Sequence, residues 1–574
     1  MEKPPLLSVD DLTIAFRSEN QETRATDQIS FHLGSSETLG IVGESGSGKT
    51  VTALSILRLL PSPPAKVLSG RIIFNDKTEG KKNILSLSEE EMRKIRGRKI
   101  SMIFQEPMTS LNPVFTCGDQ VAEILRQHLI VNKSEAKERV LELFHEVRLP
   151  EPRRVFAKYP HELSGGQKQR VMIAMAIACS PGILIADEPT TALDVTVQKT
   201  ILELLQRLQD ERKMSILFIT HDLGLISSFA RRVVVMYKGK VVEEGEVGNI
   251  FKNPQHRYTQ GLIACRPPLS ARLRRLPMVE DFINGMGGEV QVISPKEREA
   301  EHGRIYASEP VLKVAGLGKK FHQHPVSFFK KENQHRVLSN IALSVFQGET
   351  LGIVGESGSG KTTLARTMLE LIPPSEGSIL YLETEITTLN RENLKKLRKD
   401  LQIIFQDPYS SLNPRRTIGA AIMEPMVVHK ILRNNAERRA ETIRLLRQVG
   451  LEPHHFDRYP HEFSGGQRQR ICIARAIAVR PRLIICDEPV SALDVSIQAQ
   501  VLNLLNDLKS QLGLTYIFIS HDLSVVKYMA DRLIVMKEGK IVEMGDADQI
   551  YKNPREEYTR LLLEAIPGQK SKEP

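Results

Sequence analysis

An eight-residue phosphate-binding pattern occurs twice in the chain. The sequence GESGSGKT stands at 43–50 and again at 355–362, and it fits the pattern G-x-x-x-x-G-K-[ST]. Glycines let such a loop turn its backbone N–H groups toward phosphate oxygens, and the N-terminus of the following helix adds positive potential. We therefore expect two nucleotide sites, with the loop residues Gly43, Glu44, Ser45, Gly46, Ser47, Gly48, Lys49, Thr50, Gly355, Glu356, Ser357, Gly358, Ser359, Gly360, Lys361 and Thr362.

The last two residues of each loop indicate ATP with Mg²⁺ as the cofactors. Lys49 and Lys361 are expected to reach the β- and γ-phosphates, and Thr50 and Thr362 to ligate Mg²⁺. Each loop follows an apolar run, as a phosphate loop at the end of a buried strand requires.

Two adjacent carboxylates follow a second apolar run in each half. Asp187 and Asp487 each end a run of four apolar residues, and a carboxylate there can hold Mg²⁺, usually through water. Glu188 and Glu488 come next. A carboxylate beside the γ-phosphate can polarise the attacking water as a general base.

A histidine and a glutamine complete each set. His221 and His521 follow Glu188 and Glu488 by 33 residues in both halves, and this recurrence favours a contact with the γ-phosphate over a structural role. Gln105 and Gln406 are the candidates to orient the attacking water and the metal ion.

These motifs belong to an internal repeat that extends over most of the chain. The second copy follows the first by 312 residues at the phosphate loop, by 301 at the glutamine and by 300 from the segment SGGQ onward. The first copy is thus longer by 11 residues between loop and glutamine. We place this excess around Asn75–Glu91, which is rich in Lys, Glu and Ser, and interpret it as an inserted surface loop.

Apolar strands before the motifs alternate with segments of helical spacing, which predicts an α/β fold. We expect a first ATPase domain at 1–265, a linker with some structure of its own at 266–310, and a second ATPase domain at 311–574.

Composition narrows the class further. The net charge is +10, but Lys and Arg are scattered among acidic residues, which favours solubility over a dedicated polyanion surface. No run of apolar residues approaches the 18 that a membrane span needs, and the N-terminus lacks an apolar stretch of signal-peptide length. A role at a membrane would therefore require other chains that span it.

Together these residues resemble the ATP-binding cassette (ABC) ATPases. LSGGQ at 163–167 is that family's signature, and FSGGQ at 463–467 departs from it only at the first position. The resemblance implies two tandem P-loop ABC nucleotide-binding domains, each with a RecA-like core and a helical subdomain. It also implies two composite ATP sites, each formed by the phosphate loop of one half and the signature of the other, which adds Ser164, Gly165, Gly166, Gln167, Ser464, Gly465, Gly466 and Gln467 as nucleotide-binding residues.

The same resemblance assigns two further pairs of residues. Asp194 and Asp494 would lie across the seam between the closed cassettes, and Phe16 and Phe321 stand where an aromatic side chain usually stacks on adenine. A core position is an equally good interpretation of either phenylalanine.

Two features are similar to the dipeptide, oligopeptide and nickel importer group. SLNP follows the glutamine at 110–113 and 411–414, and NPQHRYTQGLIACRPPL at 253–269 is similar to the group's tail, with Arg257 where proline is usual. The second tail, at 553–560, keeps Tyr-Thr but lacks the histidine. Fused double cassettes of this kind resemble glutathione-importer and Yej-type peptide-importer ATPases.

This resemblance implies an ATP-hydrolysing importer subunit that takes up peptides or a related small solute. Its partners would be two membrane-spanning permease subunits and, through them, an extracytoplasmic solute-binding protein, with no nucleic acid. It would lie at the cytoplasmic face of the inner (plasma) membrane as a peripheral protein. The alternative is a soluble tandem cassette protein that acts on ribosomes or DNA.

Overall fold

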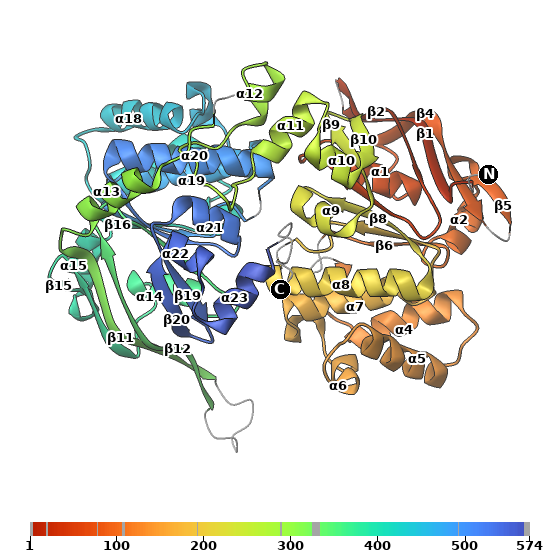
Figure 1. Cartoon of the computed structure of the whole chain (residues 1–574), viewed down its shortest axis with the longest axis horizontal. Helices are drawn as coiled ribbons and strands as arrows, with labels where there is room; N and C mark the ends of the chain where they lie inside the picture. Colours follow the sequence, from red (N-terminus) through yellow and green to blue (C-terminus); the bar gives the residue numbers. More distant parts are fainter. Residues whose placement is uncertain are drawn as a thin grey trace. The chain divides into compact units, whose positions relative to one another are not determined.

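The computed structural model describes residues 4–18, 21–76, 79–105, 110–191, 193–287, 290–323, 333–491 and 493–566. They form two compact units. The first contains the chain up to Ile263 together with Phe282–Met286, and the second contains Ala264–Asp281 and Gly287–Ile566. Each unit combines β-sheets with surrounding helices (Figure 1), so the predicted α/β class is confirmed for both halves.

The first unit contains a six-stranded sheet of order β10-β9-β3-β8-β7-β6 and a four-stranded sheet of order β2-β1-β4-β5. The large sheet is parallel except for β10, and the small sheet is antiparallel. The strands are β1 (Leu7–Ser18), β2 (Gln21–Leu33), β3 (Thr38–Val42), β4 (Ala65–Asp76), β5 (Gly80–Asn83), β6 (Ile100–Ile103), β7 (Ile183–Asp187), β8 (Ser215–Thr220), β9 (Arg232–Tyr237) and β10 (Lys240–Glu246).

Helices of the first unit connect these strands. Those between β6 and β7 contact one another and form the helical subdomain that the family resemblance implies. The helices are α1 (Lys49–Ile56), α2 (Glu89–Ile95), α4 (Cys117–His128), α5 (Lys133–Glu146), α6 (Pro152–Phe156), α7 (Gly165–Ile177), α8 (Val195–Arg212), α9 (Leu223–Phe229), α10 (Val247–Lys252) and α11 (Arg257–Ala264), with short 3-10 turns η1 (Ile84–Ser86) and η2 (Pro160–Glu162).

The second unit repeats both sheets, in the orders β16-β17-β18-β13-β19-β20 and β12-β11-β14-β15. Its strands are β11 (Pro310–Gln323), β12 (Asn333–Phe346), β13 (Thr350–Val354), β14 (Glu376–Tyr381), β15 (Thr384–Glu385), β16 (Leu401–Ile404), β17 (Leu483–Asp487), β18 (Thr515–Ile519), β19 (Arg532–Lys537) and β20 (Lys540–Asp546). Its helices are α14 (Lys361–Met368), α15 (Arg391–Leu397), α16 (Pro408–Ser411), α17 (Ile418–Val428), α18 (Asn435–Gln448), α19 (Gly465–Ile477), α20 (Val495–Leu512), α21 (Leu523–Met529), α22 (Ala547–Lys552) and α23 (Glu557–Glu564), with η3 (Ile386–Thr388), η4 (Pro453–Asp457) and η5 (Pro460–Glu462).

The central strands are buried on both faces, which explains why their sequences are continuous apolar runs rather than alternating ones. Every residue of β3, β7 and β8 is buried. Leu39 and Ile41 of β3 pack in one core with Ile14 and Ile29 of the antiparallel sheet. The carboxyl end of β3, where the phosphate loop begins, is thus held between two packed layers.

The excess length of the first cassette is not the surface loop that we expected. Asn75 and Asp76 belong to β4, and 89–91 open α2. Part of the excess lies before Asn75, in the strand β4 itself. β4 begins at Ala65 and its first residues pair with β1, whereas its equivalent in the second cassette, β14, begins only at Glu376 and is shorter. Lys, Glu and Ser suit the exposed face of an edge hairpin as well as they suit a loop, and composition alone did not separate the two.

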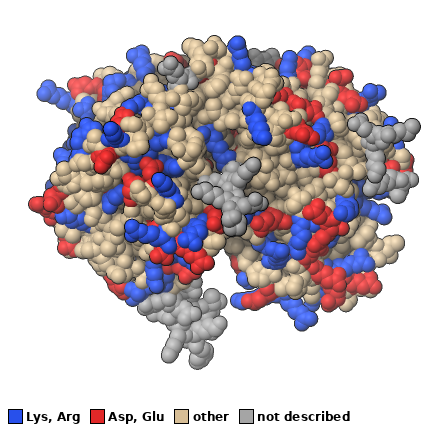
Figure 2. All heavy atoms as spheres, in the orientation of Figure 1, with Lys and Arg blue, Asp and Glu red and all other residues tan. Residues whose placement is uncertain are grey.

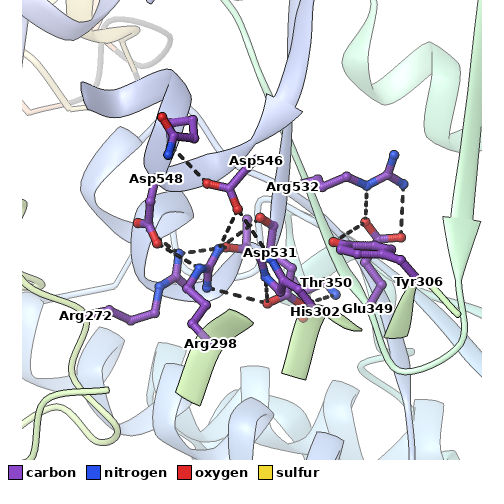
Figure 3. Close-up of polar contacts among 12 residues, drawn as sticks. Arg272, Arg298, His302, Tyr306, Glu349, Thr350, Asp531, Arg532, Asp546 and Asp548 are labelled. Carbon is purple, nitrogen blue, oxygen red and sulfur yellow. Dashed lines mark hydrogen bonds and ion pairs between the residues drawn. The ribbon is translucent and has the colours of Figure 1, made fainter. Parts of the chain in front are cut away.

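The segment between the cassettes packs on the second unit. It contains α12 (Val279–Ile283) and α13 (Pro295–Ile305). Arg272 donates to the main-chain oxygens of Tyr528 (3.1 Å) and Ala530 (2.8 Å), at the C-terminal end of α21. Arg298 of α13 lies 2.8 Å from Asp548 and donates to the main-chain oxygen of Asp531 (2.9 Å). Figure 3 shows these side chains converging with His302 on Asp531, Asp546 and Asp548.

Two of the three carboxylates that receive this segment are particular to the second cassette. Asp531 and Asp548 stand where the first cassette has Arg231 and Gly248. Asp531 is buried, whereas the Arg231 side chain is 81% exposed. Acidic and basic side chains are otherwise mixed over the face drawn in Figure 2, as the scattered charges of the sequence predict.

Candidate active site

Each phosphate loop is fixed by its own lysine. Lys49 is buried at the start of α1, and its Nζ donates to the main-chain oxygens of Gly43 (2.7 Å) and Glu44 (2.8 Å). Gly48 caps this helix with φ 100°, and a Cβ there would lie 2.6 Å from the Ala25 oxygen, so only glycine fits. In the second loop, Lys361 makes the same two bonds with the same lengths, to the oxygens of Gly355 and Glu356.

Both loops contain a buried hydroxyl that fits a phosphate ligand. Ser47 Oγ and Ser359 Oγ have no hydrogen-bond partner among the described residues, although both are buried. A buried hydroxyl without a partner costs about 1–3 kcal/mol. A phosphate oxygen in the loop would satisfy it, so the residues present fit a nucleotide triphosphate.

The residues predicted to hold Mg²⁺ lie together at the ends of neighbouring elements. Thr50 Oγ1 donates to Asp187 Oδ1 at 3.4 Å, and Thr362 Oγ1 to Asp487 Oδ1 at 3.2 Å. Burial raises the pKa of Asp187 to about 6 and also raises the pKa of Asp487. A cation bound beside these carboxylates would favour their ionised form, so the donor set fits Mg²⁺.

Glu188 is held at three points. Gln105 Nε2 donates to its Oε2 (3.0 Å), Thr191 Oγ1 donates to the same oxygen (2.9 Å), and His221 Nδ1 lies 3.1 Å from Oε1. Burial alone would raise the pKa of Glu188, but the contact with His221 and the Thr191 hydrogen bond outweigh it and lower the pKa to about 2. The carboxylate is therefore ionised and oriented, as a general base must be.

Glu488 has nearly the same surroundings. Gln406 Nε2 donates to Glu488 Oε2 (2.9 Å), and His521 Nδ1 lies 3.0 Å from the same oxygen. Burial opposes ionisation here too, and His521 again outweighs it, so the pKa lies below its usual value. The hydroxyl of Ser491 also donates to the main-chain oxygen of Glu488 (3.2 Å).

Each of the two glutamates has a strained backbone conformation that sets the direction of its side chain. Glu188 and Glu488 have φ of 47° and 49°, in the left-handed region that side chains other than glycine rarely adopt. The N–H of each donates to the strand before the histidine, to Ile219 oxygen (2.9 Å) and to Ile519 oxygen (3.0 Å). Residues with such strained backbone angles cost free energy in the folded state, and they are found most often at functional sites.

The two signatures form well-capped helix N-termini. Ser164 accepts a hydrogen bond from Gln167 N (3.3 Å), and Gln167 Oε1 accepts one from Ser164 N (3.2 Å), at the start of α7. Ser464 and Gln467 form the same reciprocal pair at the start of α19. A helix N-terminus of this kind suits an anion.

The remaining sequence candidates occupy less distinctive places. Asp194 and Asp494 precede α8 and α20 as their N-terminal cap residues. Phe16 is half-buried and packs on the core of the first unit, whereas Phe321 is exposed beneath Lys319. The stacking of either ring on adenine stays a prediction.

Two tyrosines that we did not predict support the phosphate loops. Tyr258 of α11 is fully buried, and its hydroxyl accepts a hydrogen bond from Glu44 N (3.0 Å). Tyr558 of α23 accepts one from Glu356 N (3.2 Å). The Tyr-Thr pair that both tails keep was the available signal, but the tail lies more than 200 residues from the loop, so only the fold reveals the contact.

Comparison with known families and proteins agrees with this geometry. The ABC transporter family matches residues 26–191 and 338–491. These two matches cover more than half of the chain, so the chain belongs to the ABC transporter family, and it is a tandem, ATP-binding ATPase. A second family, the oligopeptide/dipeptide transporter C-terminal region, matches residues 242–282 and 542–574.

Among individual relatives, the chain is similar to two glutathione import ATP-binding proteins GsiA. It is 46% identical to that of Salmonella choleraesuis (strain SC-B67) over 567 residues, which cover 98% of this chain and 89% of the relative. It is 46% identical to that of Escherichia coli (strain K12) over 570 residues, with the same coverage.

The structure contains no metal-binding group of three or more His, Cys, Asp or Glu side chains within the described ranges. Among the same residues, no helix has the length and apolarity needed to cross a bilayer.

Proposed function

We propose that this chain couples ATP hydrolysis at two sites to the import of glutathione or a related small peptide. The observation that carries the proposal is the duplicated site, in which a glutamine and a histidine hold an ionised glutamate next to a phosphate loop. The tails of the oligopeptide/dipeptide type support import. The similarity to glutathione import ATP-binding proteins supports the substrate class.

Each site has the groups that ATP hydrolysis needs. Lys49 and Lys361 would bind the β- and γ-phosphates, while Thr50 and Thr362 would hold Mg²⁺ with the neighbouring aspartates. Glu188 would accept a proton from the attacking water, which Gln105 would orient, and His221 would contact the γ-phosphate. Gln406, Glu488 and His521 would repeat these roles. When bound, Mg²⁺ supplies charge neutralisation for the phosphates.

The two sites are proposed to be composite. Ser164 to Gln167 would close on the ATP held by the second loop, and Ser464 to Gln467 on the ATP held by the first. The capped N-termini of α7 and α19 are suited to this task because they present backbone N–H groups to an anion. In this proposal the domains are 1–265 and 311–574, joined by 266–310.

The proposed partners are two membrane-spanning permease subunits, reached by an extracytoplasmic solute-binding protein on the opposite side. The chain would then lie as a peripheral protein on the cytoplasmic face of the inner membrane. Gln105 and Gln406 suit a coupling role, because their side chains contact the proposed catalytic glutamates. A soluble protein that acts on ribosomes or DNA is the competing function, and the importer-type tails weigh against it.

Uptake of radiolabelled glutathione by cells that lack the chromosomal gene tests the proposal. The wild-type chain should restore uptake together with its permeases. Glu188→Gln and Glu488→Gln should each lower uptake at least tenfold while leaving the amount of chain in the membrane fraction unchanged. A labelled dipeptide serves as the second substrate. Full uptake by the double variant would refute ATP-driven import, and RNase-sensitive association with ribosomes would favour the competing function.

A further inference from the structure

The two cassettes present different chemistry at one equivalent surface. In both halves the SLNP segment is followed by two residues and then by a helix that begins after a threonine cap, Thr116 before α4 and Thr417 before α17. The two residues are Val114 and Phe115 in the first cassette, and Arg415 and Arg416 in the second.

The backbone of this turn is the same in both copies. Val114 N donates to Asn112 Oδ1 (3.1 Å), and Arg415 N donates to Asn413 Oδ1 (3.0 Å). The next residue in each copy donates its N–H to the main-chain oxygen of the same asparagine. The side chains at these positions therefore differ on an unchanged scaffold, which makes the difference one of chemistry and not of shape.

A third position extends the contrast. Arg475 of α19 stands where α7 has Met175. Its Nη1 donates to Ser411 oxygen (2.8 Å), and its Nη2 lies 3.8 Å from Glu424, which also accepts a 2.7 Å hydrogen bond from Arg416. We call Arg415, Arg416, Glu424 and Arg475 the arginine face, and Val114, Phe115, Glu123 and Met175 the apolar face.

The arginine face and the apolar face also differ in formal charge, and both contain exposed side chains. The arginine face has three arginines and one glutamate, a formal charge of +2, whereas the apolar face has one glutamate and a formal charge of −1. Arg415 is exposed, and the side chains of Arg416 and Arg475 are 50% and 39% exposed. Val114 and Phe115 are 71% and 55% exposed. Contiguous apolar side chains that are exposed to solvent are a feature of interaction sites.

The arginines are prepared for carboxylates. Glu424 holds two guanidinium groups in place, and the bonds to Asn413 and Ser411 fix the turn. Preorganised arginines lose little freedom when they bind a planar, bidentate acceptor. The first two residues of each face follow within ten residues the glutamine that contacts the proposed catalytic glutamate, so an occupant would adjoin the segment that leads to the ATP site.

We propose that the arginine face binds a cytoplasmic segment of one permease subunit that presents at least two carboxylates, and that the apolar face binds an apolar segment of a different permease subunit. This inference rests on the proposed importer function and deepens it. It makes the two permease subunits non-interchangeable, with the charge of their cytoplasmic segments as the basis of their pairing with the two cassettes.

Photochemical crosslinking tests the pairing in the complete transporter. Arg415→Cys and Val114→Cys are each labelled with a benzophenone maleimide and illuminated in membranes that contain the permease subunits, and the labelled wild-type chain reports the background from its own cysteines. Position 415 should crosslink to one permease subunit through a peptide with two or more Asp or Glu, and position 114 to the other subunit through an apolar peptide. Crosslinks from both positions to the same subunit in equal yield would overturn this inference and leave the import function standing. A complete lack of permease crosslinks at both positions would also overturn this inference, whereas a failure of the wild-type chain to restore glutathione uptake would overturn the import function.

Charge reversal provides the matched variants. The double change Arg415→Glu and Arg416→Glu should weaken binding to the permease membranes about tenfold or more, because like charges then meet at the interface. The double change to Lys should retain most of the binding. The basal ATPase activity of the purified chain should stay unchanged in both, which shows that they are folded. Equal binding by the Glu and Lys variants would contradict the proposal.

A lipid headgroup is the other anion that arginines could bind. Sedimentation with vesicles of phosphatidylglycerol and of phosphatidylcholine separates the two sources. We expect the wild-type and the Glu variant to bind phosphatidylglycerol vesicles equally. Loss of that binding in the Glu variant, together with unchanged permease crosslinking from labelled Arg415→Cys that also carries Arg416→Glu, would assign the arginine face to lipid and overturn the proposal.

Discussion

Removal of one buried carboxylate should detach the inter-cassette segment from the second unit. Asp531 is only 5% exposed, and its Oδ2 accepts hydrogen bonds from Thr350 N (2.9 Å) and Lys509 Nζ (3.1 Å). Arg298 and His302 of α13 lie 3.7 Å from its Oδ1. Asp531→Ala leaves the lysine and the arginine without their shared counter-ion and leaves one buried N–H unpaired, so we expect a loss of about 3–5 kcal/mol of local stability.

The repeat supplies a matched control. Arg231→Ala changes the equivalent position of the first cassette, where the side chain is 81% exposed and lies 3.9 Å from Glu246. Exposed ion pairs contribute little, so the expected loss is under about 0.5 kcal/mol. If Asp531→Ala loses more stability than Arg231→Ala, the additional loss comes from the contacts with the inter-cassette segment. It does not come from the backbone at this position, which both cassettes share.

Hydrogen exchange with mass spectrometry resolves the two units and needs no tryptophan, which the chain lacks. At pH 7 the peptides of α13 and β13 should exchange at least about 100-fold faster in Asp531→Ala, while peptides of the first unit stay unchanged. Equal protection of α13 in the variant and the wild-type would refute the reasoning, as would an equal loss of protection in Arg231→Ala.

The lowered pKa of Asp531 also determines how its contribution to stability changes with pH. Burial alone would raise the pKa of Asp531, but the charge of Lys509, the contacts with His302 and Thr350 and the charge of Arg298 outweigh it and hold the pKa well below the usual value. A lowered pKa in the folded state stabilises the protein fully above the unfolded pKa of about 3.9 and progressively less below it. The advantage of the wild-type over Asp531→Ala should therefore be constant near neutrality and shrink as the pH falls below about 4.

Three further outcomes are expected at the ATP sites. His221→Ala removes the main contact that opposes burial at Glu188, so the pKa of Glu188 should rise and the acid limb of the ATPase pH profile should move to higher pH; an unmoved limb in a Glu488→Gln background would contradict this. Tyr258→Phe should raise the KM for ATP about fivefold with little change in kcat, since it removes one hydrogen bond from Glu44 N, and steady-state ATPase assays would show an unchanged KM if the contact is idle. Chelation of Mg²⁺ with EDTA should abolish ATPase activity, and added Mg²⁺ should restore it; full activity in EDTA would exclude the proposed metal role of the threonine–aspartate pairs.

The parts of the site that the sequence revealed are those in which chemistry and chain order coincide. Lys49 follows its loop directly, and Glu188 follows its strand directly, so a local pattern is enough to find them. Repetition then singled out Gln105 and His221 among the glutamines and histidines of the chain. The hydrogen bonds of both residues to Glu188 agree with that interpretation.

Contacts between segments that lie far apart in the sequence could not be predicted from local sequence patterns. Tyr258 supports the loop from 214 residues away, and Arg272 reaches α21 from 256 residues away. No local periodicity marks either contact. The excess in the first cassette shows a related limit, because an exposed hairpin and an exposed loop have the same composition.

The repeat carries information in its differences as well as in its identities. The residues proposed to bind ATP and Mg²⁺ and to activate water are of the same types in both halves. Asp531 against Arg231, and Arg415 with Arg416 against Val114 with Phe115, are differences on a shared backbone. Two cassettes that served identical neighbours would have no physical reason to differ at these positions. The first difference fixes where the inter-cassette segment packs, and the second gives each cassette a partner of its own, so the fusion of two similar ATPases into one chain fits a transporter whose two membrane halves are unlike.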